Sequence, residues 1–206
     1  RLGPDHPSTL TAMNDLASAY QQAGKVEKAL PLLAETLRVQ EAKYGEDHPN
    51  TLVGASNLGA LYFQTGKNDL AIPLLEKTVR LQKAKLGADH PETLGGMGNL
   101  AAAYWRAKRL DDSIPMFEAL LKAQEAKLGR AHPTTLGTIA NLGVNYGTAG
   151  RWKDALPLQE EVRVAARSNP ALRGALPDLL ITYLHLEQFD EATALLAELV
   201  DDLRKS

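Results

Sequence analysis

Apolar residues recur along most of the chain at three- and four-residue spacing, the period of an amphipathic helix. In the stretch 48–66 they fall at Leu52, Ala55, Leu58, Gly59 and Tyr62. The pattern stops at Gly66, a residue type that commonly follows the end of a helix. Sustained strand-type alternation is not found, so the sequence predicts an all-α protein.

A second apolar stripe follows after a short turn, at Leu70, Ala71, Leu74, Leu75, Thr78 and Leu81. We expect it to end at Gly87, where glycine can close the helix in the left-handed conformation. The two stripes predict a helical hairpin, and we name its first helix A and its second helix B.

The hairpin pattern repeats. His6, His48, His90 and His132 are spaced 42 residues apart, and so are three further sets of equivalent residues. These sets are Leu16, Leu58, Leu100 and Leu142; Tyr20, Tyr62, Tyr104 and Tyr146; and Pro31, Pro73, Pro115 and Pro157. A fifth unit appears after a shortened step of 37 residues, which aligns Leu179 with Leu142. The predicted repeats are 6–45, 48–87, 90–129, 132–168 and 171–204.

A fixed period of this length is typical of stacked helical repeats. We therefore expect about ten helices in one open α-solenoid array over residues 1–206, rather than a closed globule. The fifth repeat lacks the histidine phrase and is expected to be an atypical C-terminal cap. Because the chain opens without Met inside a repeat phrase, we interpret it as a fragment of a longer protein.

The phrase "KLGADHPETL" (85–94) and its equivalents mark the link between successive repeats. The glycines are expected to close helix B and the prolines to start the next helix A. Asp47 and Asp89 are expected to cap helix A by accepting from its free amides. Pro31 and its equivalents fall about one turn inside helix B, so helix B either starts late or bends there.

These features resemble the tetratricopeptide repeat (TPR), a helical hairpin of about 34 residues. Leu58, Gly59, Tyr62, Gly66 and Ala71 have the spacings of that family. The longer period and the "LGxDHPxTL" link are similar to the repeats of kinesin light chain and of bacterial signalling proteins. Lys108 and Glu187 depart from the family by replacing the turn glycine.

The resemblance implies a right-handed superhelix in which the A helices line a concave groove that binds extended or helical segments of other proteins. It also favours a cytoplasmic location. Within helix A, we expect the residue before the repeated Leu to face this groove. That residue is Asp15, Asn57, Asn99, Asn141 or Asp178.

A carboxamide at this position can donate to and accept from a peptide main chain without requiring a particular sequence. The alternative is that each Asn hydrogen-bonds to the backbone of the neighbouring repeat. Both interpretations remain open at this stage.

Specificity is expected from other residues on the same face: Asn14, Gln21, Phe63, Gln64, Trp105 and Arg106. The two aromatic residues could receive an apolar side chain of a partner, or they could pack between repeats. Because Arg106 is the main positive charge on this face, we do not expect capture of a carboxylate or an acidic peptide. The predicted partner is a neutral or mildly apolar protein segment.

Composition limits the other function classes. The formal net charge of −2 offers no broad attraction for nucleic acid or an anionic membrane. No apolar run approaches the roughly 18 residues of a membrane span. The chain has no Cys, and one His per repeat should not converge on a metal ion. His185 has no recognisable partner.

No nucleophile motif or phosphate loop is found. The nearest feature, "GGMG" at 95–98, lies in a helix and is expected to allow close backbone approach or an open groove. We therefore predict a non-catalytic interaction scaffold without a cofactor. The alternative is a regulatory or oligomerising spacer within a larger signalling protein, for which a homo-oligomer would be the partner.

Overall fold

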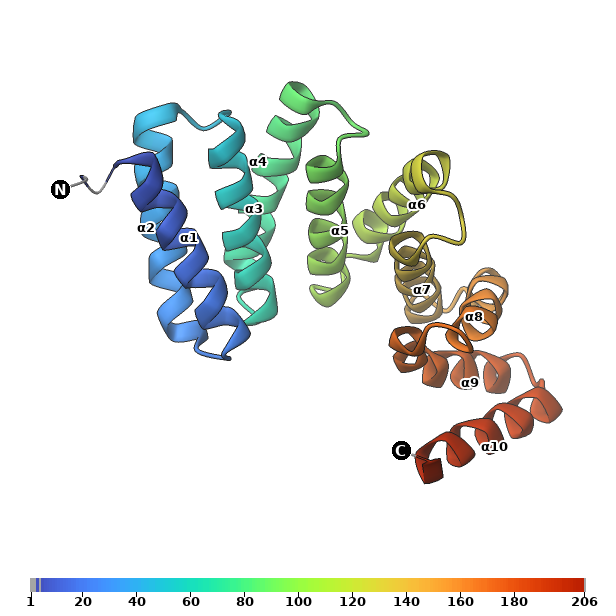
Figure 1. The fold of residues 1–206 in the computed structure, drawn as a ribbon. Helices are drawn as coiled ribbons and strands as arrows, with labels where there is room; N and C mark the ends of the chain where they lie inside the picture. The colour runs from blue at the N-terminus through green and yellow to red at the C-terminus, as the bar shows by residue number, and fades with distance from the viewer. Residues whose placement is uncertain (1–2, 4, 206) are drawn as a thin grey trace. The chain divides into compact units, whose positions relative to one another are not determined.

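A computed structural model describes residues 3 and 5–205 of the chain, and these fold into ten α-helices with no strand among them (Figure 1). The helices are α1 (Pro7–Gln22), α2 (Val26–Tyr44), α3 (Pro49–Gln64), α4 (Asn68–Leu86), α5 (Pro91–Arg106), α6 (Leu110–Leu128), α7 (Pro133–Thr148), α8 (Trp152–Ala166), α9 (Leu176–His185) and α10 (Phe189–Lys205). A short 3₁₀ helix (Pro170–Ala175) precedes α9. The expected all-α fold of helix A and helix B pairs is confirmed.

The chain divides into two compact units, Arg1–Arg109 and Leu110–Ser206. In the first unit, α2 packs on α1, α3 on α2, α4 on α3 and α5 on α4. In the second unit, each helix from α7 to α10 likewise packs on the helix before it. Each core is therefore built from helices that are close in sequence, as expected for stacked repeats.

Most of the predicted helix A core is confirmed. Leu52, Ala55 and Leu58 are buried on α3, and the equivalent Leu100 and Leu142 are also buried. Leu16 was expected to be buried too, but it is 46% exposed. Leu58 packs into a cluster with residues of the preceding helix α2, whereas α1 follows no helix among the described residues.

The predicted stripe of helix B is partly wrong. Ala71, Leu75 and Thr78 are buried, but Leu70 is 46% exposed. The buried face instead extends to Ile72, Val79 and Gln82. Because α4 packs against both α3 and α5, its buried surface is wider than the single stripe that periodicity indicates.

Helix A begins at the proline of each link, as predicted, and its N-cap is the preceding His. In each case the ring Nδ1 accepts from the backbone amide two residues later, at 3.1 to 3.3 Å. The four residues are His6, His48, His90 and His132. Asp47 and Asp89 are therefore not the N-caps of α3 and α5, contrary to the prediction; His48 and His90 are. The Asp47 carboxylate instead lies 3.0 Å from Lys85 Nζ, which lowers the pKa of Asp47.

Gly45 and Gly87 close helix B with positive φ, but with ψ near 160°. The expectation of a left-handed helical residue is therefore wrong, and the residues lie in an extended region that is essentially restricted to glycine. Lys108 and Glu187 do adopt the left-handed φ of the turn glycines that they replace, at 62° and 59°.

The prolines lie inside helix B, because α2 already begins at Val26 and α4 at Asn68. The alternative of a late start is thus wrong. The residue four positions before each proline, whose carbonyl loses its helical donor, is exposed in α2, α4, α6 and α8. Water can satisfy these carbonyls, which explains how the repeats accommodate the proline.

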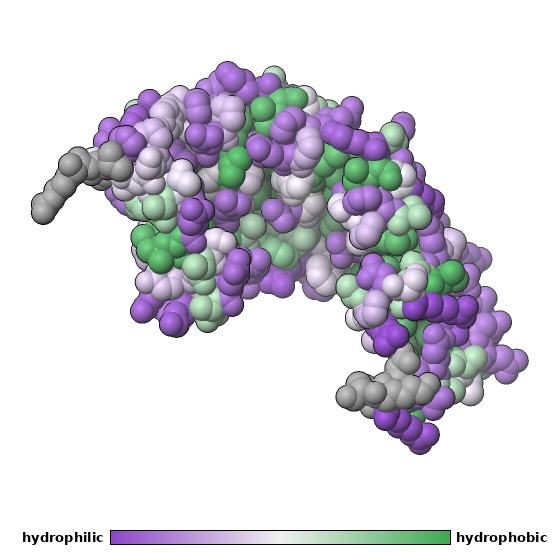
Figure 2. Space-filling model, in the orientation of Figure 1, coloured by the Kyte–Doolittle hydropathy of each residue, from purple (hydrophilic) through white to green (hydrophobic). Residues whose placement is uncertain are grey.

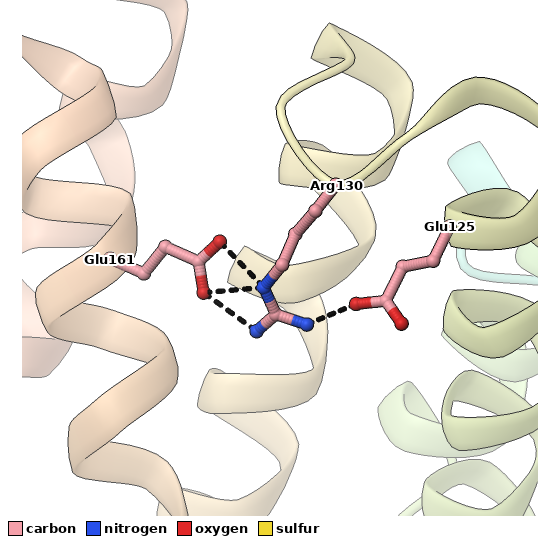
Figure 3. Close-up of polar contacts among 3 residues, drawn as sticks. All are labelled: Glu125, Arg130 and Glu161. Atoms are coloured by element: carbon pink, nitrogen blue, oxygen red, sulfur yellow. Dashed lines mark hydrogen bonds and ion pairs between the residues drawn. The ribbon is translucent and has the colours of Figure 1, made fainter.

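Ion pairs join two of the links to the B helix that follows, and these two links use the same positions with opposite charges. Before α3, Glu46 lies 2.8 Å from Lys77 of α4. Before α7, Arg130 lies 2.6 Å from Glu161 of α8 and also pairs with Glu125 of α6 (Figure 3). Arg130 and Glu161 each follow their counterparts by two repeat lengths, so the pair is conserved in position while its sign is reversed.

We expect His132→Ala to lower the free energy of unfolding by about 1 kcal/mol, because the first turn of α7 loses its capping acceptor. His132→Asn should be close to wild type, since an Asn side chain can accept the same amide. Denaturant unfolding of the three proteins measures the difference. Equal stability of the Ala and Asn variants would contradict the capping role.

The reversed ion pair provides a second prediction. Arg130→Glu should destabilise the protein by about 1 kcal/mol, because it places a carboxylate beside Glu125 and Glu161. Adding Glu161→Lys recreates the arrangement of Glu46 and Lys77 and should restore most of the loss. A double-mutant cycle with Arg130→Ala and Glu161→Ala measures the coupling free energy. A coupling free energy near zero would show that the pair does not contribute.

Candidate peptide-binding surface

The five candidate residues that precede the repeated Leu all lie on A helices. Asp15, Asn57 and Asn141 are exposed, on α1, α3 and α7, and Asn99 and Asp178 are half-buried, on α5 and α9. None of the three Asn side chains forms a hydrogen bond within the described part of the chain. The alternative, in which each Asn bonds to the backbone of the neighbouring repeat, is therefore not observed.

A cleft of ≈ 280 Å³ in the first unit brings three candidate residues together. Asn14 and Asp15 line it from α1, and Asn57 lines it from α3. The rest of the wall comes from Pro7, Leu10, Thr11, Gln40, Tyr44, Asn50 and Val53. The cleft thus combines carboxamides, one carboxylate and several apolar side chains, a composition that suits a peptide segment.

Four further candidates form contacts with one another between repeats of the first unit. Gln21 Nε2 donates to Gln64 Oε1 at 2.7 Å. The Arg106 guanidinium lies 4.4 Å from the centre of the Phe63 ring, and its Nη1 donates to the Phe63 carbonyl at 2.8 Å. One face of Phe63 is therefore already covered, and a partner would contact its remaining surface or displace Arg106. The sixth candidate, Trp105, is half-buried on α5.

In the second unit, Asp178 lines a cleft of ≈ 180 Å³ together with Val144, Trp152, Gln159 and Ile181. Burial raises the pKa of the Asp178 carboxyl, since a low-polarity surrounding disfavours its charged form. The sequence indicated no partner for His185, but its ring stacks on the lining residue Trp152 with ring centres 4.0 Å apart.

The "GGMG" segment serves both structural purposes that were considered for it. A side chain at Gly96 would collide with Gln82 and Val79, so this glycine allows close approach of α4. No atom lies near the corresponding position at Gly95, so this glycine leaves open space.

Sequence reasoning missed a set of buried glutamines at the repeat period, Gln40, Gln82 and Gln124. Each is at most 5% exposed, and the amide oxygen of each lacks a hydrogen-bond donor within the described residues. Gln82 Nε2 donates to Ser56 at 3.1 Å. Their spacing of 42 residues within the apolar face of helix B was the available signal.

A second repeated contact is a hydrogen bond from a Tyr of helix A to a Glu of the preceding helix B. The hydroxyl of Tyr104 donates to Glu76 at 2.7 Å, and that of Tyr146 donates to Glu118 at 2.6 Å. Burial and the adjacent Glu118 raise the pKa of Tyr146 to about 12. These contacts hold each A helix against the preceding helix B, and they do not involve Asn57, Asn99 or Asn141.

The face drawn in Figure 2 mixes hydrophilic and hydrophobic side chains without a large block of either kind. Within the described residues, no group of His, Asp and Glu side chains is placed to hold a metal ion. No described helix is long and apolar enough to cross a membrane.

Comparison with known proteins agrees with the helix pairs and their links. The family profile described as "Tetratricopeptide repeat" matches residues 8–84, 50–107 and 92–168, well over half of the chain. The chain belongs to the tetratricopeptide repeat family. TPR repeats generally mediate protein–protein interactions and are generally non-catalytic scaffolds.

Solved structures show the same fold. The nearly identical TPR-like repeats of a kinesin light chain-like protein from Podosopora anserina are 29% identical, with a TM-score of 0.82 and coverage of 97% of each chain. BtubC from P. vanneervenii is 20% identical with a TM-score of 0.79, covering 93% of this chain and 78% of the other. MamA from MSR-1 is 19% identical with a TM-score of 0.65, covering 96% and 98%. No curated protein sequence matched the chain.

Proposed function

We propose that the A helices of this TPR protein bind an extended or helical segment of a partner protein through the Asn and Asp side chains that precede the repeated Leu. The observation that carries this proposal is that the Asn57, Asn99 and Asn141 carboxamides are not used within the fold. An Asn in the middle of a helix is unfavourable by about 0.5 kcal/mol relative to Ala. A residue with this cost and no internal hydrogen bond is better explained by an external partner.

The chemistry of the surface supports a segment that is largely neutral or mildly apolar. A ladder of carboxamides can pair with main-chain N–H and C=O groups, which every peptide offers. Val53, Phe63 and Trp105 add apolar surface for side chains. The groove-lining roles of Asn14, Gln21, Gln64 and Arg106 also belong to this proposal.

A peptide screen by fluorescence anisotropy tests the ladder, using the wild type and the triple variant Asn57→Ala, Asn99→Ala, Asn141→Ala. Losing three hydrogen bonds should weaken peptide binding by at least about tenfold. The same variant should be as stable as the wild type or more stable, because Ala is the better helix former. This opposite change in stability and binding separates a binding role from a structural one.

Circular dichroism provides the control for folding. Unchanged peptide affinity in a correctly folded triple variant would rule out the ladder. The second candidate function, an oligomerising spacer, would instead give concentration-dependent association in analytical ultracentrifugation and no peptide hits. The assignment of all five repeats to one binding array stays a prediction from the sequence.

A further inference from the structure

We infer that the cleft between α1 and α3 binds the guanidinium group of an arginine side chain in the partner segment. This inference rests on the proposed function and adds one positively charged position to an otherwise neutral segment. It concerns the cleft of ≈ 280 Å³ that contains Asn14, Asp15, Gln40 and Asn57.

The charge of the cleft favours a cation. Asp15 is the one ionisable carboxylate among the lining residues, and no Lys or Arg lines the cleft. Asp15 is exposed and forms no ion pair within the described residues. The neighbouring cation, Lys43, lies 5.4 Å from the centre of the Tyr44 ring. Its ammonium group is 3.5 Å from the Asp5 carboxylate, so its charge is already balanced and Asp15 remains available.

Two amide oxygens in the wall also lack donors. Asn14 Oδ1 and Gln40 Oε1 are buried and unpaired within the described residues, and the Gln40 residue is 4% exposed. A buried acceptor without a donor loses its hydration without replacement. Of the two residues, Asn14 is the one whose oxygen a donor entering the cleft would satisfy.

The orientation of the Gln40 amide follows from its equivalent in the second repeat. Gln82 donates through Nε2 to Ser56 and turns Oε1 towards Gly96. Gln40 likewise turns Oε1 towards Gly54, next to the lining residue Val53. Gln40 Oε1 therefore packs against α3, and Asn14 Oδ1 is the unpaired acceptor left for a ligand of this cleft.

Arginine matches these features better than other side chains do. Its planar guanidinium carries five N–H donors and no acceptor, and the cleft is lined by the Asp15 carboxylate and the carboxamides of Asn14 and Asn57. Its aliphatic stem can pack on Leu10 and Val53 while the charged end reaches Asp15. An acidic side chain would be repelled by Asp15.

The second repeat lacks this combination. Asn57 stands where the first repeat has Asp15, and Ser56 stands where it has Asn14. Ser56 accepts the hydrogen bond of Gln82, whereas Asn14 Oδ1 has no donor within the described residues. Glu92 stands where the first repeat has Asn50, so the carboxylate lies at a different position in the two repeats. Exchanging Asp15 and Asn57 between the repeats therefore tests the position of the charge.

The test is a titration of the ¹⁵N-labelled chain with Nα-acetyl-arginine methylamide, followed by NMR. We expect shifts confined to residues of α1, α2 and α3 that line the cleft. The citrulline, lysine and glutamate analogues should each bind at least about threefold more weakly. Asp15→Asn should weaken arginine binding about two- to fivefold, the range of an exposed ion pair. Asn57→Asp should strengthen it by a similar factor.

Equal binding of the citrulline analogue, equal binding of the lysine analogue, or an unchanged affinity in Asp15→Asn would each overturn the inference. Shifts spread over other helices would overturn it as well. Both exchanges use residues that the equivalent repeat already carries, and circular dichroism checks that the variants fold. If arginine fails while neutral peptides still bind through the Asn ladder, the inference falls and the proposed function stands.

Discussion

The structure depends on burial of apolar surface between helices that follow one another in the chain. A single hairpin of helix A and helix B has too little interior to be stable, and each pair buries its remaining apolar face on the next. Helix α4 shows this directly, because it packs against both α3 and α5. Leu75, which lies against Gly59 of α3, is at 0% exposure.

Polar contacts then fix the register of the stacked pairs. The His caps start every helix A of the first four repeats, and the ion pairs of Glu46 and Arg130 tie a link to the helix B that follows. The reversal of charge between these two pairs shows that the position, rather than either residue, is what the repeat requires. Such exposed pairs add little free energy individually, but they favour one alignment over others.

The packing of the repeats also explains why we expect function on the A helices. Their Leu and Tyr side chains contact helix B, whereas Asn57 and Asn141 remain exposed and their carboxamides form no hydrogen bond within the described residues. The first cleft adds unpaired acceptors and the Asp15 carboxylate to this surface. The proposed function therefore assigns recognition of a partner to the surface where the fold leaves polar groups unsatisfied.

The sequence by itself determined the helix pairs, their period and the helix starts at Pro49, Pro91 and Pro133. These follow from local rules, since helical spacing, proline and glycine act within a few residues of themselves. The placement of Asn57 on the open side of α3 also followed from helical periodicity.

Only the tertiary structure decided which neighbour each side chain meets. It showed that Leu16 and Leu70 are exposed and that His185 stacks on Trp152. It also placed Gln40 beside Asn14 and Asp15. These outcomes depend on contacts between helices, and the spacing of residues within one helix does not specify what the adjacent helix presents.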